Sequence, residues 1–151
     1  MGDSASIGNQ PARGMQAATW GVRAAFAIVF VANVQCAVSF VLWPAAYAPA
    51  YELAGATGSA AVQGIGVAFL MWNATYPAVI ASPRRFRALA VVVLVQQVIG
   101  LVGESFIRAT LPAGHAVLAA SIDRFIAFDG VGLVLMAAAF AWLVAVERRS
   151  S

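Results

Sequence analysis

The chain has 151 residues, of which 62% are hydrophobic and only 10% are charged. Its mean hydropathy of +0.86 lies outside the range of soluble globular domains, so the composition predicts one helical domain in a membrane. The nine basic residues are all arginine and form no long run. We therefore interpret the pI near 9.8 as a consequence of membrane topology, and we expect no nucleic-acid partner.

Three scarce residue types exclude whole classes of site. The chain has no lysine, which excludes a Schiff-base cofactor held by this chain. Cys36 is the single cysteine, so neither an intrachain disulfide nor a C-x-x-C redox pair can form. His115 is the single histidine, which excludes bis-histidine haem and multi-histidine metal sites unless a partner subunit donates ligands. We expect no cofactor and no metal site.

The segment before the first apolar stretch, residues 1–19, is rich in Gly, Ser, Asn, Gln and Pro and has no apolar periodicity. This composition predicts a disordered cytoplasmic tail.

Four apolar stretches follow, at residues 24–43, 60–80, 88–107 and 125–146. The hydrocarbon core of a bilayer is about 30 Å thick and a helix rises about 1.5 Å per residue, so roughly 20 apolar residues are needed to cross it. Each stretch supplies about that many, which predicts an all-α, integral-membrane four-helix bundle. We expect a single domain over residues 20–147, a short cytoplasmic tail at 148–151, and a fourth helix that starts early, along the outer interface, and then turns inward.

The arginines are distributed unevenly between the two sides of this bundle. If the N-terminus is cytoplasmic, only Arg108 and Arg124 fall outside, and seven of the nine arginines fall inside. The positive-inside rule then predicts both termini in the cytoplasm. The excess of alanine and arginine is typical of a high-GC bacterial genome, so we expect the inner membrane of a bacterium.

A rival interpretation takes the first stretch as a cleaved signal peptide, since Ala46-Tyr47-Ala48 resembles a cleavage site. The apolar run is about 20 residues long, whereas a signal core has about 7 to 15. Pro49 would also follow the cut, where we expect it to block cleavage. We therefore expect no cleavage.

Polar amides recur at membrane depth in the first three stretches. In the second, Gln63, Gly66, Asn73 and Pro77 fall on one face of a helix, and Pro77 predicts a kink because it leaves the Asn73 carbonyl without its usual partner. These amides are either interhelical glue or the lining of a wet or ligand-holding cavity, and the sequence leaves both open. The candidate network is Asn33, Gln63, Asn73, Gln96 and Gln97.

Charged residues in the last two stretches form a second candidate cluster: Glu104, Arg108, Arg124 and Asp129. Glu104 and Arg108 are four residues apart, so we expect them to pair. In an antiparallel pair of helices all four would lie near the outer leaflet boundary, and Glu104 and Asp129 would be the only buried acids. The cluster is then a salt-bridge lock between the two spans, a binding or proton-handling site, or a contact with another subunit.

Three segments carry a resemblance to known proteins: residues 62–73, 100–105 and 124–130. They resemble segments of uncharacterised bacterial four-span proteins, whose architecture is similar to that of the DoxX-like group. The likeness covers residues 42 to about 143 in arrangement. It implies a four-span fold but carries no activity and no catalytic residue.

Three function classes remain, and no motif names a reaction. The sequence favours a small non-enzymatic membrane protein, an accessory factor or a subunit of a larger complex. The alternative is a membrane binder or enzyme for a lipid- or quinone-like ligand, using the acids near the outer leaflet. The third is a transporter or channel made from several copies.

Overall fold

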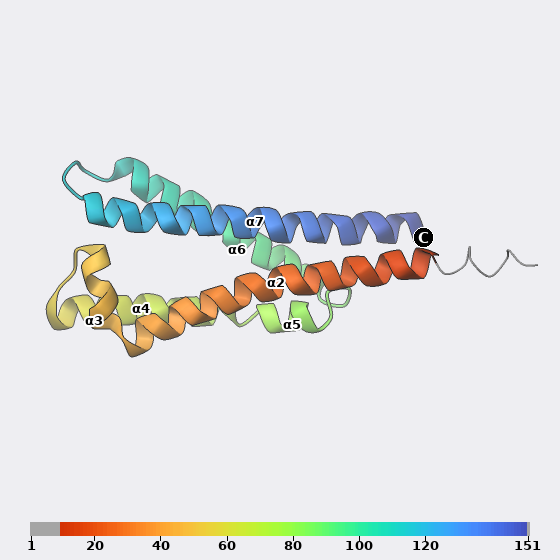
Figure 1. The fold of residues 1–151 in the computed structure, drawn as a ribbon, viewed down its shortest axis with the longest axis horizontal. Coiled ribbons are helices and arrows are strands. Elements are labelled where there is room, and N and C mark those ends of the chain that lie inside the picture. The colour runs from red at the N-terminus through yellow and green to blue at the C-terminus, as the bar shows by residue number, and fades with distance from the viewer. Residues whose placement is uncertain (1–9, 151) are drawn as a thin grey trace, which may run out of the picture.

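The computed structural model describes residues 10–150, which fold into an all-α bundle (Figure 1). Four long apolar segments make up this bundle. They are α2 (Gln10–Leu42), α4 (Gly55–Asn73) with α5 (Tyr76–Ala81), α6 (Arg87–Thr110) and α7 (Ala116–Ser150). The short α3 (Pro44–Tyr47) and the 3-10 helix η1 (Ala48–Tyr51) follow α2.

Each long segment can span a bilayer. The shortest, α6, has 24 residues and is about 36 Å long, against a hydrocarbon core of about 30 Å. Large apolar side chains such as Val31, Ile99 and Phe106 are more than 60% exposed on the outside of the bundle, where lipid would cover them. The chain is therefore a multi-pass membrane protein, as its hydropathy predicts.

The bundle has two distinct ends (Figure 1). We call the end that holds Gln10, Ser150 and the turn between α5 and α6 the terminal end. The opposite end holds α3, η1 and the turn between α6 and α7, and we call it the loop end. Helices α2 and α7 lie close at the terminal end and separate toward the loop end, where η1 packs against α7.

The second span is broken where the sequence predicts it. Helix α4 ends at Asn73, and α5 begins at Tyr76 with Pro77 in its first turn. Proline has no N–H to continue the hydrogen-bond ladder, so the ladder is interrupted at this point. The break between α4 and α5 confirms the predicted interruption at Pro77.

Two apolar clusters hold the helices together. The larger, in the terminal half, includes Phe26, Tyr76, Met136 and Leu143, and the smaller, in the loop half, centres on Phe40. Buried Asn73 lies between the two clusters along its span, and buried Gln97 on α6 follows the residues of the larger cluster. The fold thus places a polar layer between two apolar ones.

Helices α2 and α4 approach closely at Gly66. A Cβ atom built there would lie 2.8 Å from the Ala37 carbonyl oxygen and 2.9 Å from the Cβ of Phe40. Small residues allow this contact, which takes the place of a hydrophobic driving force between helices in lipid.

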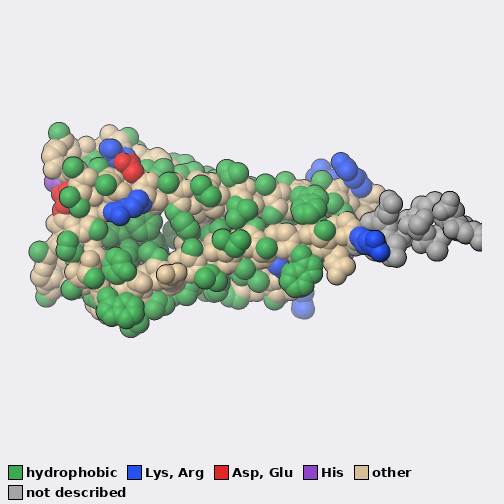
Figure 2. All heavy atoms as spheres, in the orientation of Figure 1, with side chains coloured by type: hydrophobic (Ala, Val, Ile, Leu, Met, Phe, Trp, Pro, Cys, Tyr) green, Lys and Arg blue, Asp and Glu red, His purple; other side chains and the backbone are tan. Residues whose placement is uncertain are grey.

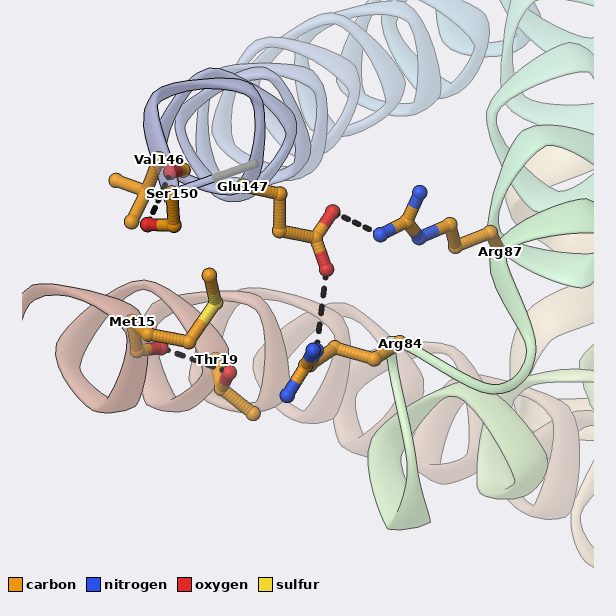
Figure 3. A network of polar contacts seen from close by, with 7 residues as sticks. All are labelled: Met15, Thr19, Arg84, Arg87, Val146, Glu147 and Ser150. Carbon is orange, nitrogen blue, oxygen red and sulfur yellow. Dashed lines mark hydrogen bonds and ion pairs between the residues drawn. The ribbon is translucent and has the colours of Figure 1, made fainter. Parts of the chain in front are cut away.

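A buried acid closes the terminal end (Figure 3). Glu147 on α7 is 8% exposed. Its carboxylate accepts a 3.1 Å hydrogen bond from Nε of Arg84 and forms an ion pair with Arg87. These contacts tie α7 to the turn between α5 and α6. The expectation that Glu104 and Asp129 are the only buried acids is therefore wrong. Glu147 follows buried Leu143 by one helical turn, which places it on the buried face.

Two further expectations about the elements are corrected. Residues 10–19 belong to α2 rather than to a disordered tail, because the apolar packing of this helix extends to Ala18, which is fully buried. The rest of the expected tail lies outside the described residues. Helix α7 is one continuous helix of 35 residues. It does not first run along the interface and then turn.

Candidate functional site

A small, partly open cavity of about 40 Å³ lies between the four long segments. Carboxyl and amide groups line it, together with the aromatic rings of Phe69, Trp72 and Phe125. The polar side chains are Asn33, Asn73, Gln97, Glu104 and Asp129. A water molecule needs about 10 to 15 Å³ by this measure, so the cavity has room for a few small atoms or ions. No basic side chain is among the described residues that line it.

Gln97 is the most buried polar residue of the site, at 2% exposed, and both ends of its amide form hydrogen bonds. Its Nε2 donates a 2.8 Å hydrogen bond to Oδ1 of Asp129. Its Oε1 accepts a 3.4 Å hydrogen bond from the hydroxyl of Tyr76, which is fully buried. This chain of contacts links α5, α6 and α7 and fixes the orientation of the Asp129 carboxylate.

Gly100 makes room for that carboxylate. A Cβ built on Gly100 would lie 2.7 Å from Oδ2 of Asp129 and 3.1 Å from the Trp72 ring. Any larger residue would therefore push the carboxylate or the ring out of place. On the same helix, Gly103 has nothing within 4 Å of a built Cβ.

Two oxygen atoms at this cavity have no hydrogen-bond partner among the described residues. One is Oδ1 of Asn73, whose Nδ2 donates 2.7 Å to the carbonyl of Phe69. The other is Oε2 of Glu104. Buried acceptors are normally paired, and each unpaired one costs free energy. The cavity thus presents more acceptors than donors.

A larger groove of about 460 Å³ adjoins the cavity and opens between α2, η1 and α7 near the loop end. Figure 2 shows this face, where hydrophobic side chains line a hollow between α2 and α7. Asn33 and Phe125 line both spaces. Phe40 and Phe128 add apolar surface to the groove, and Cys36 lies on its wall.

Polar groups gather at one part of this groove. Arg124 donates 3.2 Å hydrogen bonds from Nε to the Ala120 carbonyl and from a terminal nitrogen to the Ser121 hydroxyl. Ser121 in turn donates to the Ala50 carbonyl at 2.7 Å. Tyr51 also lines the groove, and burial raises the pKa of its hydroxyl well above the usual range. The Tyr51 hydroxyl therefore stays protonated and can donate a hydrogen bond.

The structure divides the predicted charged cluster into separate parts. Glu104 and Asp129 line the same cavity, whereas Arg124 lines the groove. The expected pair of Glu104 with Arg108 is wrong, because Nε of Arg108 donates 2.8 Å to Asp123 on α7 instead. Glu104 faces the bundle interior, and Arg108 lies one turn closer to the loop end, where α7 is within reach.

The predicted amide network is likewise split. Asn33, Asn73 and Gln97 meet at the cavity. Gln63 lies apart and donates a 3.1 Å hydrogen bond to the Val41 carbonyl of α2, so it acts as interhelical glue. Gln96 is half-buried, and its Oε1 has no partner among the described residues. Gln97 rather than Gln96 is the residue that joins the acid.

Three residues of the site carried little signal in the sequence. Tyr51 and Ser121 lie in or near the loops, and aromatic or hydroxyl residues at such positions are typical of the membrane interface. Tyr76 precedes a proline, and this pattern predicts a break in the helix backbone but no role for the tyrosine side chain. The one usable signal was the proximity of Tyr76 to the predicted kink.

Comparisons with protein-family models, with curated proteins and with solved structures found no match to this chain. The resemblance to DoxX-like proteins thus has no support from a family match and assigns no activity. The geometry of the cavity and the groove is what bears on function.

Proposed function

We propose that this multi-pass membrane protein binds an amphipathic ligand of the lipid or quinone class in the groove between α2 and α7. The groove itself carries the proposal. Its volume of about 460 Å³ falls within the roughly 300 to 1,000 Å³ of typical small-molecule pockets. A ligand dissolved in the bilayer could enter from the side, because two long helices, α2 and α7, form two of the groove's walls and η1 forms the third.

The lining suits a ligand with two unlike parts. Phe40, Phe125 and Phe128 offer aromatic surface to an apolar body. Tyr51 and Arg124 offer hydrogen-bond donors to a head group. Since both are donors, the head that fits is an acceptor, such as a quinone carbonyl or a lipid phosphate.

The charge distribution supports one orientation of the protein in the membrane. Seven arginines lie at the terminal end, and Arg108 and Arg124 lie toward the loop end. The positive-inside rule supports both termini in the cytoplasm of a bacterial cell, with the protein in the inner membrane. The head group would then lie near the outer leaflet boundary. The seven are Arg13, Arg23, Arg84, Arg85, Arg87, Arg148 and Arg149.

The groove also changes which of the predicted roles is best supported. The role of an accessory subunit without a ligand does not explain why the protein has an open groove lined partly by polar groups. A transporter made from several copies needs a path, and the polar space inside one copy is only about 40 Å³. Both roles are compatible with four spans, but neither accounts for the groove, and the binding role does.

Retention of ligand by a purified sample tests this proposal. The protein in dodecyl maltoside is mixed with decylubiquinone or with dioleoylphosphatidylglycerol, and bound ligand is counted by native mass spectrometry. Ala32 lines the groove, so Ala32→Phe should fill it and abolish retention. The matched control is Val31→Phe at the neighbouring, lipid-facing position, which is 61% exposed. Arg124→Gln should weaken retention while leaving the fold intact.

The single cysteine locates the ligand. Cys36 lines the groove, so bound ligand should slow its labelling by N-ethylmaleimide. At a ligand concentration ten times the Kd, the rate should fall about tenfold. Unchanged labelling with both ligand classes, or equal retention by Ala32→Phe and Val31→Phe, would contradict the proposal.

A further inference from the structure

The cavity behind the groove has a chemistry of its own. Its walls carry the carboxyl groups of Glu104 and Asp129, with no basic lining residue among those the structure describes. Charged groups at membrane depth are costly unless they are compensated. Two carboxylates that share one small space are therefore compensated either by protons or by a cation that lies between them.

The amide side chains of the cavity point to the same requirement. Asn73 is 3% exposed and lines the cavity, and its Oδ1 has no partner among the described residues. Oε2 of Glu104 is unpaired as well. The amide of Gln97 does not donate to these oxygens, because its Nε2 donates to both the carboxylate and the backbone carbonyl of Asp129. Oxygen atoms from α4, α6 and α7 therefore face one space with unused lone pairs.

We propose that this cavity binds a small monovalent cation, with Na⁺ as the ion of the right size. Hard cations prefer carboxylate and carbonyl oxygens, and here the ligands are Asp129, Glu104 and the Oδ1 of Asn73. One cation compensates part of the negative charge and satisfies the unpaired acceptors together. The volume of about 40 Å³ accommodates the ion with a water molecule.

Neighbouring groups shape the site around the ion. Gln97 holds the Asp129 carboxylate through its 2.8 Å hydrogen bond. Gly100 leaves space for Oδ2 of that carboxylate. The Trp72 ring lines the same cavity, so its indole reports on occupancy and its face can attract a cation.

Binding of ²²Na⁺ to the purified protein tests the proposal directly. In a scintillation proximity assay at pH 8, with choline chloride holding the ionic strength constant, the wild type should bind close to one ion per chain. Glu104→Gln and Asp129→Asn should each weaken binding at least about tenfold. Asp123→Asn is the matched control, because it removes the same charge from an exposed carboxylate that pairs with Arg108 instead.

A second measurement protects the test against variants that fail to fold. In a Trp20→Phe, Trp43→Phe, Trp142→Phe background, Trp72 is the one tryptophan that remains. Its fluorescence intensity should change as NaCl is added and should reach a plateau, whereas choline chloride should cause no change. The proposal is overturned if the wild type binds no ²²Na⁺ above the choline background. It is also overturned if Trp72 responds to pH and not to Na⁺, since the acids then hold only protons. Ala32→Phe should leave Na⁺ binding unchanged, which separates this site from the groove.

Discussion

The replacement Gly66→Ala tests the packing that shapes the groove and the cavity. A Cβ at this position would lie 2.8 Å from the Ala37 carbonyl oxygen and 2.9 Å from both Phe40 Cβ and Val41 Cγ2. Real Cβ atoms do not approach this closely, and the nearest atom belongs to the backbone, so α2 and α4 must separate. Overpacking of this kind costs about 1 to 3 kcal/mol.

The matched control is Gly64→Ala on the same helix, where nothing lies within 4 Å of a built Cβ. Both variants gain about 1 kcal/mol of helix propensity, so their difference isolates the clash. Gly66→Ala should therefore be about 1 to 3 kcal/mol less stable than Gly64→Ala, or roughly five- to 150-fold in the unfolding equilibrium. Unfolding of bicelle-reconstituted protein by dodecyl sulfate, followed by far-UV circular dichroism, measures this. Equal midpoints for the two variants would refute the close approach of α2 and α4.

Three further substitutions probe other parts of the molecule. Glu147→Gln should destabilise the bundle by about 1 to 2 kcal/mol, because two half-exposed arginines lose their buried partner. The same dodecyl sulfate titration measures this change in stability. An unchanged stability would mean that these ion pairs do not hold the terminal end together. Hydrogen bonds from His115 and from the backbone lower the pKa of Glu52 below 4.5, so this contact stabilises the loop end above pH 4.5 and is lost as the pH falls through the lowered value. Glu52→Gln should remove that acid-induced drop in thermal midpoint, and a drop that persists would show that other acids cause it. Gly100→Ala should weaken ²²Na⁺ binding, because the new Cβ displaces the Asp129 carboxylate. Gly103→Ala is the control and should leave binding unchanged. Equal binding by the two variants would place the ion elsewhere.

The sequence predicts the spans well because bilayer crossing depends on a property that each residue contributes alone. Hydropathy summed over about 20 residues locates each helix, and Pro77 locates the break between α4 and α5. The ends of the helices are predicted less well. Helix α2 already includes the described residues 10–19, and Ala18 within this part is fully buried against other helices, which is information about tertiary contacts that hydropathy does not contain.

The candidate site depends on which helix faces which. Asn33, Asn73, Gln97, Glu104 and Asp129 are predicted as interior residues, and they meet at one cavity. The partner of Arg108 could not be predicted from spacing alone, since Glu104 at one turn and Asp123 on the next helix are both within reach of a long side chain. The groove could not be predicted from the sequence either, because it arises from the separation of α2 and α7, which is a property of the assembled bundle.

The most direct test of the proposed binding role is a density map of the protein extracted from its membrane with styrene–maleic acid polymer, which retains native lipids. The account predicts one elongated density in the groove between α2 and α7, with its head within hydrogen-bond distance of Tyr51 or Arg124 and its tail along Phe128, and no such density in Ala32→Phe. A groove closed by the protein's own side chains, or density found only on the outer faces of the helices, would contradict it.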